Sequence, residues 1–175
     1  MCRATPRRLH RQNDCVSDLR IGLGIDAHAL EEGRPLVLGG VRLEHDRGLA
    51  GHSDGDVVAH ALTDAVLGAA GLGDIGALFS SEDDRFRGAD SLDLLAEAYR
   101  QVLAAGFELV NADCIVIGEE PRIAPHRQEM RSRLAGALEV DASLVNVRAT
   151  TTDRLGFTGR GEGIAAEAVA LLRRR

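Results

Sequence analysis

The 175-residue chain contains no lysine and no tryptophan, only three cysteines, and only 3% aromatic residues. Without lysine it offers no Schiff-base amine, no lysine nucleophile and no P-loop lysine. The cysteines stand at positions 2, 15 and 114, with no C-x-x-C pair. This excludes a disulfide framework and a thiolate zinc site, and favours a reducing cytoplasm. No apolar run reaches the roughly 18–20 residues of a membrane helix, so we expect no contact with a membrane.

Charge is spread unevenly along the chain. Residues 1–20 carry five arginines and two aspartates, whereas the other 155 residues carry 16 arginines against 25 acidic residues. Such an acidic body argues against a nucleic-acid partner. Residues 1–19 show no hydrophobic period and predict a flexible N-terminal leader. Residues 20–175 are long enough, and at 45% hydrophobic content apolar enough, to predict a single globular domain.

The hydrophobic pattern predicts strands and helices that alternate around a mixed sheet, which is an α+β fold. The predicted strands cover residues 20–29, 109–118 and 145–151, with a hairpin over 35–43 that turns at Gly39-Gly40. The strand 109–118 is continuously apolar at its centre, which predicts that both its faces are covered. The predicted helices cover residues 53–70, 91–105, 125–138 and 162–172. Ser53 or Asp54 would cap the first of them.

One set of polar residues has the composition of a metal site. Asp26 and His28 lie two apart on a predicted strand and leave it on the same face. His60 lies four residues after Asp56 and four before Asp64, in a polar stripe on the predicted helix. If this helix packs on the strand, Asp26, His28 and His60 converge and suit a catalytic zinc with one open position. Asp64 or Asp56 could then hold the other ring nitrogen of His60. From spacing alone, an exposed helical histidine and a strand-end Asp-x-His pair are the simpler interpretation.

Two further segments are suited to phosphate. His52 stands just before a predicted helix N-terminus, where free backbone amides attract anions, although helix capping alone explains the neighbouring acids. Three threonines at 150–152 precede Asp153 and the glycine-rich stretch 156–163, which includes Arg160. Hydroxyls, turn amides and a guanidinium make a plausible phosphate cradle, and Asp153 could hold Mg²⁺. The alternative is a connecting loop that happens to be rich in glycine and threonine.

Four sequence blocks follow one another: G-x-G-I-D-A-H at 22–28, H-S-D-G-D-V-V-A-H-A-L-T-D-A-V-L-G-A at 52–69, G-D-I-G at 73–76, and A-T-T-T-D-R-L-G-F-T-G-R-G-E-G at 149–163. In this order they resemble the 2-C-methyl-D-erythritol 2,4-cyclodiphosphate synthase family. The resemblance covers the chain from residue 20 to about residue 173. It implies an α+β fold with a four- to five-stranded mixed sheet, helices on one face, and sheets that face the centre of a homotrimer with active sites between subunits.

The resemblance also implies roles for individual residues. Asp26, His28 and His60 match the ligands of a Zn²⁺ or another divalent metal. His52 and Thr151 match residues that stabilise the transition state, and Ser53 matches a phosphate contact. The other implied substrate-binding positions are Asp74, Gly76, Phe79 and Asp83 on the methylerythritol side, Arg122, Thr150 and Thr152 on the cytidine diphosphate side, and Phe157 and Arg160. Asp153 matches a position that binds Mg²⁺ or Mn²⁺ at the diphosphate.

The activity implied is that of a cytoplasmic phosphorus–oxygen lyase of the non-mevalonate isoprenoid pathway. Its substrate is a cytidine diphosphate ester, which it cyclises with release of CMP. The chain departs from the family pattern at Leu23, where histidine is usual, at Ser80, where proline is usual, and at Asp153, where glutamate is usual. A zinc-dependent phosphohydrolase that acts on a nucleotide diphosphate could use the same three ligands. A non-catalytic trimeric binding module is a third possibility.

Overall fold

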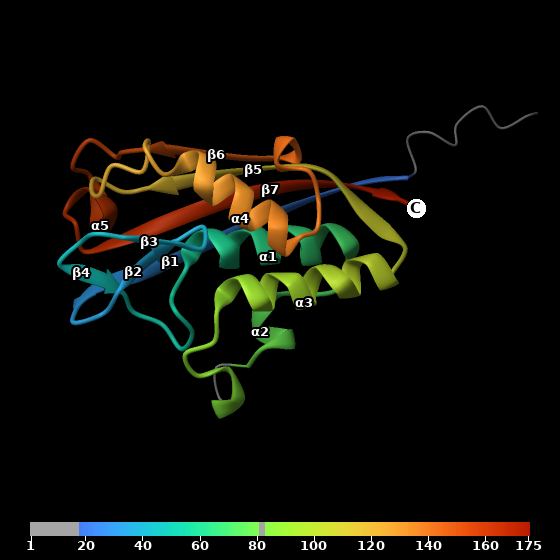
Figure 1. Ribbon diagram of the computed structural model, residues 1–175, viewed down its shortest axis with the longest axis horizontal. Coiled ribbons are helices and arrows are strands. Elements are labelled where there is room, and N and C mark those ends of the chain that lie inside the picture. The colour runs from blue at the N-terminus through green and yellow to red at the C-terminus, as the bar shows by residue number, and fades with distance from the viewer. Residues whose placement is uncertain (1–17, 81–82) are drawn as a thin grey trace, which may run out of the picture.

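A computed structural model describes residues 18–80 and 83–175. Residues 1–17 of the predicted leader 1–19, and two residues of the acidic loop, 81 and 82, lie outside the described residues. A five-stranded sheet forms the centre of the protein, in the order β4–β1–β7–β5–β6 (Figure 1). Its strands are β1 (Leu19–Glu32), β4 (Arg47–Leu49), β5 (Phe107–Ile117), β6 (Val145–Thr150) and β7 (Gly163–Arg174). Only β5 and β6 pair in parallel, so the sheet is mixed, as predicted.

The three long helices cover one face of this sheet (Figure 1). They are α1 (Val57–Ala70), α3 (Ser91–Ala104) and α4 (Arg127–Ala137). The short elements are the hairpin strands β2 (Leu36–Leu38) and β3 (Val41–Leu43), the helices α2 (Ile75–Leu78) and α5 (Gly156–Gly159), and 3-10 turns at Asp84–Phe86 and Ala142–Leu144. The predicted α+β class is therefore confirmed. Over the described ranges, no helix has both the length and the apolar character needed to cross a membrane.

The predicted C-terminal helix at 162–172 is wrong, because this segment is the central strand β7. It pairs with β1 on one side and β5 on the other. Its residues alternate in burial, with Ala166, Ala168 and Ala170 against the helices and Glu167 and Val169 on the open face. Alanine favours helices in isolation, but here two neighbouring strands supply the hydrogen bonds and the small side chains let α1 pack closely.

Helix α1 begins later than predicted, and its cap is Asp56 rather than Ser53 or Asp54. Gly55 has φ +78°, a left-handed conformation that is not helical, so α1 begins only after it, at Val57. The fully buried Asp56 carboxylate accepts hydrogen bonds from the first turn of α1, and also from the backbone N–H groups of Gly39 and Gly40 at 2.9 and 2.6 Å. These glycines have φ +57° and +73°, so the predicted hairpin turn is confirmed and is tied to the helix N-terminus.

Two glycines of β1 allow α1 to lie almost on the strand backbone. A Cβ atom added at Gly22 would lie 2.0 Å from the carbonyl oxygen of Ala65, and one added at Gly24 would lie 2.0 Å from that of Ala61. No side chain fits at either position, so the G-x-G pattern sets the short distance between strand and helix. The next residue of β1 on the same face is Asp26, and the residue before Ala61 is His60.

The other face of the sheet is open and apolar. Ile21 is 73% exposed, and Leu19, Leu23, Ile25 and Val169 also have exposed side chains. On this face the residues of β5 are mostly half-buried, whereas its helix-facing residues are buried. The prediction that both faces of β5 are covered is therefore met on only one face in the single chain. An exposed apolar surface of this kind is typical of an interface.

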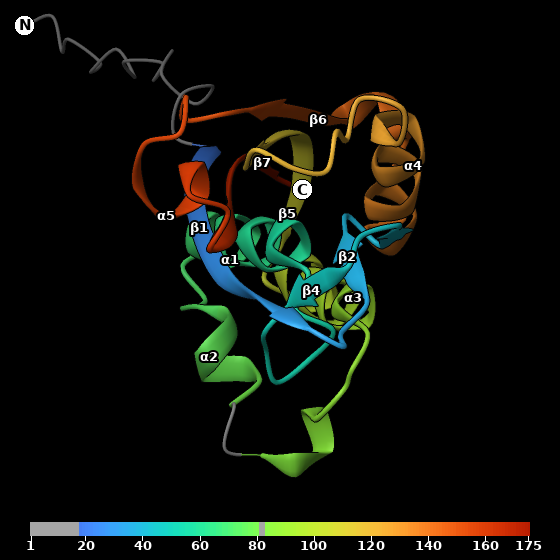
Figure 2. The same ribbon diagram turned by 90° about the vertical axis from the view of Figure 1, so that its left-hand side faces the viewer.

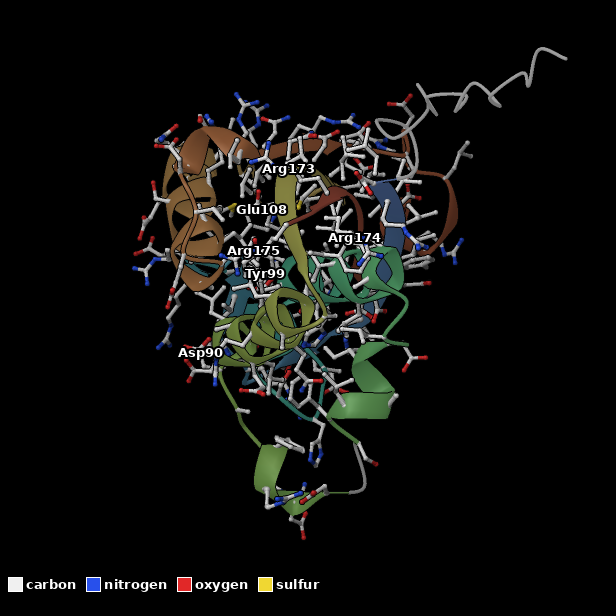
Figure 3. The ribbon with its side chains drawn as sticks, turned by 90° about the vertical axis from the view of Figure 1, so that its right-hand side faces the viewer. Asp90, Tyr99, Glu108, Arg173, Arg174 and Arg175 are labelled. Atoms are coloured by element: carbon white, nitrogen blue, oxygen red, sulfur yellow. The ribbon has the colours of Figure 1, made fainter. Side chains whose placement is uncertain are left out.

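Polar contacts connect the elements at the end of the sheet beside the C-terminus (Figure 3). The hydroxyl of Tyr99 in α3 accepts a hydrogen bond from the backbone of Leu109 at 3.0 Å. Glu108 pairs with Arg173 at 2.6 Å, while Arg174 lies over the ring of Phe107. The first contact joins α3 to β5, and the second joins β5 to β7.

A candidate metal centre and its pocket

Asp26, His28 and His60 converge at the junction of β1 and α1. Asp26 Oδ2 lies 3.0 Å from His28 Nε2 and 2.8 Å from His60 Nδ1. One possible ligand atom from each residue lies within 4.8 Å of the others. The side chains of Asp26 and His28 are 23% exposed and that of His60 is 12% exposed, so the group is sheltered yet open on one side. One carboxylate and two imidazoles suit a divalent metal with an open position, so the predicted convergence is confirmed.

The electrostatics of Asp26 agree with that use, because its histidine neighbours keep it ionised. Burial alone would raise the pKa of Asp26, but the hydrogen bonds and charges of His28 and His60 outweigh it and hold this pKa well below its usual range. The hydrogen bond to Asp26 raises the pKa of His28 against the opposing effect of burial. Asp26 is therefore ionised at neutral pH, which is the form that binds a metal.

A pocket of about 250 Å³ opens beside the three residues. It is lined by Asp26, His28, His52, Ser53, His60, Asp64, Ile75, Gly76, Phe79, Phe86 and Leu94. Polar groups gather on the β1 and α1 side, and apolar side chains on the side of α2 and the 3-10 turn. Such a pocket can hold a ligand with a charged part near the metal position and an apolar part beyond it.

Asp64 lies in this pocket but does not have the predicted role. Its Oδ1 accepts a hydrogen bond from the backbone of Ile75 at 2.7 Å, which ties α1 to α2, and burial raises its pKa. The second ring nitrogen of His60, Nε2, instead contacts the hydroxyls of Ser53 at 3.0 Å and Ser91 at 2.9 Å. The prediction that Asp64 or Asp56 orients this ring is therefore wrong, because both carboxylates are taken by backbone N–H groups.

The outer wall of the pocket is lined by Ile75 and Gly76 of α2, by Phe79, and by Phe86 of the 3-10 turn. Helix α2 lies below α1, away from the sheet (Figure 2). Asp74 caps α2 by accepting from Ala77 at 2.8 Å, and Gly76 lies within this helix. The rings of Phe79 and Phe86 meet edge to face, with their centroids 5.3 Å apart. The two phenylalanines supply the apolar side of the wall.

His52 connects this wall to the loop before α1. Its Nε2 lies 3.2 Å from the carbonyl oxygen of Asp83, and its own carbonyl accepts from Gly88 at 2.7 Å. The Asp83 carboxylate is bound by Arg85, which also lowers its pKa. The position of His52 therefore depends on the wall as well as on α1.

The second group of predicted residues lies at the end of β6. Gly118 donates its backbone N–H to Thr150 at 3.1 Å, which places the 118–122 loop beside the threonines. Thr151 Oγ1 donates to Asp153 Oδ1 at 3.3 Å, and Asp153 has φ +51°. These side chains are exposed, as a surface that receives a ligand requires.

The remaining predicted positions surround this group. Thr152 is hydrogen-bonded to the buried Thr158 at 3.0 Å. Phe157 and Arg160 are exposed on or next to α5, and Arg122 is exposed in the 118–122 loop. The glycine-rich stretch thus opens only the four-residue α5 before the chain enters β7, not the long helix expected there.

The two groups do not meet within one chain. The pocket beside Asp26 is lined by residues between positions 26 and 94, and the threonine group contributes none of them. The structure therefore places the Asp26 pocket and the threonine group on separate parts of the surface.

Ser91, Asp54 and Phe86 contribute to this region and were not predicted to do so. Ser91 is fully buried at the start of α3 and touches His60, 31 residues away in sequence. The sequence predicts Asp90 or Ser91 as the cap of this helix, and the structure shows that Asp90 is the cap and Ser91 the first helical residue.

The fold and the three convergent residues define an α+β protein with a candidate metal centre beside a ligand-sized pocket. The chain belongs to the YgbB family, whose model matches residues 19–173. It is 63% identical over 158 residues to the 2-C-methyl-D-erythritol 2,4-cyclodiphosphate synthase of Rubrobacter xylanophilus, covering 89% of this chain and 95% of that protein. The Geobacillus kaustophilus synthase is 56% identical over 155 residues, covering 89% and 98%.

Solved structures agree with this assignment. The bifunctional IspDF of Campylobacter jejuni superposes with a TM-score of 0.87 at 47% identity, over 90% of this chain and 43% of that one. A CDP-bound 2C-methyl-D-erythritol-2,4-cyclodiphosphate synthase superposes with a TM-score of 0.80 at 41% identity, over 87% and 99%.

Proposed function

We propose that this chain converts 4-diphosphocytidyl-2-C-methyl-D-erythritol 2-phosphate into 2-C-methyl-D-erythritol 2,4-cyclodiphosphate and CMP, in the non-mevalonate isoprenoid pathway. The observation that carries the proposal is the convergence of Asp26, His28 and His60 beside the pocket, in a chain that covers nearly the whole length of relatives named for this activity. The activity is that of a phosphorus–oxygen lyase.

The reaction is an intramolecular phosphoryl transfer. An oxygen of the substrate's 2-phosphate forms a bond to the β-phosphorus, and the bond from this phosphorus to the oxygen of the CMP part breaks. CMP leaves with the electron pair of that bond. No protein nucleophile is needed, in agreement with a chain that lacks lysine. Catalysis then rests on positioning and charge stabilisation.

Asp26, His28 and His60 would hold the metal, which we take to be Zn²⁺. When bound, it polarises phosphate oxygens. Ser53 and His52, both in the pocket wall, donate hydrogen bonds to phosphate oxygens. The apolar wall keeps water from the phosphorus, because water would otherwise compete as a nucleophile.

The same wall orients the sugar part of the substrate. In this proposal Asp74, Gly76, Phe79 and Asp83 surround the methylerythritol carbon chain. Phe79 and Gly76 already line the pocket, which supports their assignment.

In this proposal the threonine group at the end of β6 binds the cytidine diphosphate part. Thr150, Thr151 and Thr152 offer hydroxyls, and Asp153 offers a carboxylate for Mg²⁺ or Mn²⁺ at the diphosphate. Thr151 also stabilises the transition state. Arg122, Phe157 and Arg160 complete this side.

Because the Asp26 pocket and the threonine group are apart within one chain, the proposal includes a homotrimer in which neighbours bring them together. The exposed apolar face of the sheet supports this assembly. We place the enzyme in the cytoplasm, where its buried free Cys114 stays reduced.

Phosphorus NMR of the purified protein with substrate, Zn²⁺ and Mg²⁺ tests the reaction. Two coupled ring phosphates that appear together with CMP would support the cyclase. Inorganic phosphate or an open-chain product would instead identify a zinc-dependent phosphohydrolase. His60→Ala should lose both bound zinc and turnover, and normal turnover in this zinc-free variant would contradict the metal assignment.

A further inference from the structure

The two ring nitrogens of His60 face different surroundings. Nδ1 lies 2.8 Å from Asp26 Oδ2, on the side of the candidate metal position. Nε2 points the other way and lies 2.9 Å from Ser91 Oγ and 3.0 Å from Ser53 Oγ. A histidine can bind a metal through one nitrogen only if that nitrogen carries no proton, so the partner of the other nitrogen matters.

Ser91 is placed rigidly enough to act as that partner. It is fully buried and is the first residue of α3. Its hydroxyl donates a hydrogen bond to Asp54 Oδ1, and its backbone N–H lies 3.3 Å from Asp54 Oδ2. The backbone N–H of Asp54 in turn donates a hydrogen bond to the carbonyl oxygen of Ala89 at 3.1 Å. The Asp54 carboxylate, in the loop before α1, thus binds the start of α3 through two hydrogen bonds.

The direction of these hydrogen bonds follows from the chemistry of the groups. An ionised carboxylate only accepts hydrogen bonds, so the Ser91 hydroxyl donates its single proton to Asp54. Ser91 Oγ can then only accept from its other two neighbours, His60 Nε2 and Ser53 Oγ, which puts a ring proton on Nε2. When a metal takes the place of the contact between Nδ1 and Asp26 Oδ2, a ring proton kept on Nε2 leaves Nδ1 with the lone pair that binds the metal.

We infer that Asp54 and Ser91 are positioning residues, which hold His60 in the tautomer and orientation that bind a metal through Nδ1. The inference rests on the proposed metal centre and extends it to two residues that touch neither the substrate nor the metal. The negative charge of Asp54, relayed through one hydroxyl, also makes the His60 ring a better donor to a cation.

The test is a zinc competition titration of the metal-free, full-length protein against a chromophoric chelator. Ser91→Ala should weaken zinc binding about 10- to 100-fold, as is usual for loss of a partner behind a metal ligand. Asp54→Asn should weaken it less, because an amide oxygen can still accept from Ser91 while the charge is gone. Thr63→Val is the matched control, since Thr63 is a fully buried hydroxyl on the same helix that bonds only to Ala59.

Nitrogen-15 NMR of the zinc-loaded protein gives a second, structural measurement. We expect the His60 ring proton on Nε2 and protected from exchange, with this protection lost in Ser91→Ala. A ring proton on Nδ1 would overturn the inference.

The inference would also be overturned if Ser91→Ala and Asp54→Asn bind zinc as tightly as the unmodified chain. Equal weakening in Thr63→Val would overturn it too, because the cause would then be a loosened helix. The His60→Ala variant distinguishes a failure of the proposed metal centre from a failure of the role proposed for Asp54 and Ser91. If it binds zinc like the unmodified chain, the metal centre itself fails. If it loses zinc while Ser91→Ala keeps it, only the present inference fails.

Discussion

Replacing Gly24 with alanine should damage both stability and metal binding through one steric contact. The new Cβ would lie 2.0 Å from the carbonyl oxygen of Ala61, whereas real Cβ atoms essentially never approach another atom closer than 3.0 Å. The contact is with backbone, so no side-chain rotation relieves it, and β1 must move away from α1 by about 1 Å. We expect a loss of about 3 kcal/mol in the free energy of unfolding, at the upper end for overpacking, even after the usual gain of alanine over glycine.

The same displacement should separate the metal ligands. Asp26 Oδ2 and His60 Nδ1 are 2.8 Å apart across this strand–helix junction, and metal–ligand distances tolerate only about 0.2 Å of error. Zinc affinity should therefore fall about tenfold or more.

Urea denaturation of the metal-free protein and a zinc titration, both at fixed protein concentration, measure these two effects. The matched control is Gly68→Ala in α1, where an added Cβ meets nothing within 4 Å. It should be neutral or stabilising by up to about 1 kcal/mol. If Gly24→Ala unfolds at the same urea concentration as Gly68→Ala and binds zinc normally, the close approach of β1 and α1 does not set the site.

Three further changes have definite expected outcomes. Asp56→Ala leaves four backbone N–H groups without their partner and should cost about 3–4 kcal/mol in urea denaturation. Asp56→Asn keeps the oxygen that accepts three of these bonds and should cost clearly less; equal losses would contradict this geometry. Burial raises the pKa of Cys114 to about 12, so about one thiol in a thousand is ionised at pH 9. Peptide mapping after alkylation at pH 9 should find Cys114 unmodified until urea unfolds the chain, and rapid labelling of the folded protein would refute its burial. Asp153→Ala should weaken the dependence of turnover on Mg²⁺, and an unchanged magnesium titration would count against its role.

Local pattern was enough to predict much of the candidate metal centre. Two-residue spacing on a strand puts Asp26 and His28 on one face, and four-residue spacing puts His60 on the polar edge of a helix. Their convergence depends on which helix packs against the strand, and residue spacing alone cannot predict that. The glycines at 22 and 24 carry that information, because only a strand without side chains admits a helix so closely.

Two features depended on contacts distant in sequence and were missed. Strand β7 is rich in alanine, and its strand conformation comes from hydrogen bonds to β1 and β5 rather than from local preference. Ser91 has the sequence of an ordinary helix start, and its contact with His60 exists only because α3 returns beside α1. The alternating period of β7, with Glu167 and Val169 on one side, was the available signal.

Strand β1 carries two surfaces on alternate residues. Gly24 and Asp26 face the helix and the candidate metal centre, while Leu23 and Ile25 face outward from the sheet. A rigid strand cannot shift on one face without shifting on the other. Whatever covers the outer face and whatever ion binds at Asp26 therefore stabilise the same strand position. By thermodynamic linkage, each should strengthen the binding of the other. Metal loading would then be visible as a change in the self-association constant, and dilution as a change in metal affinity.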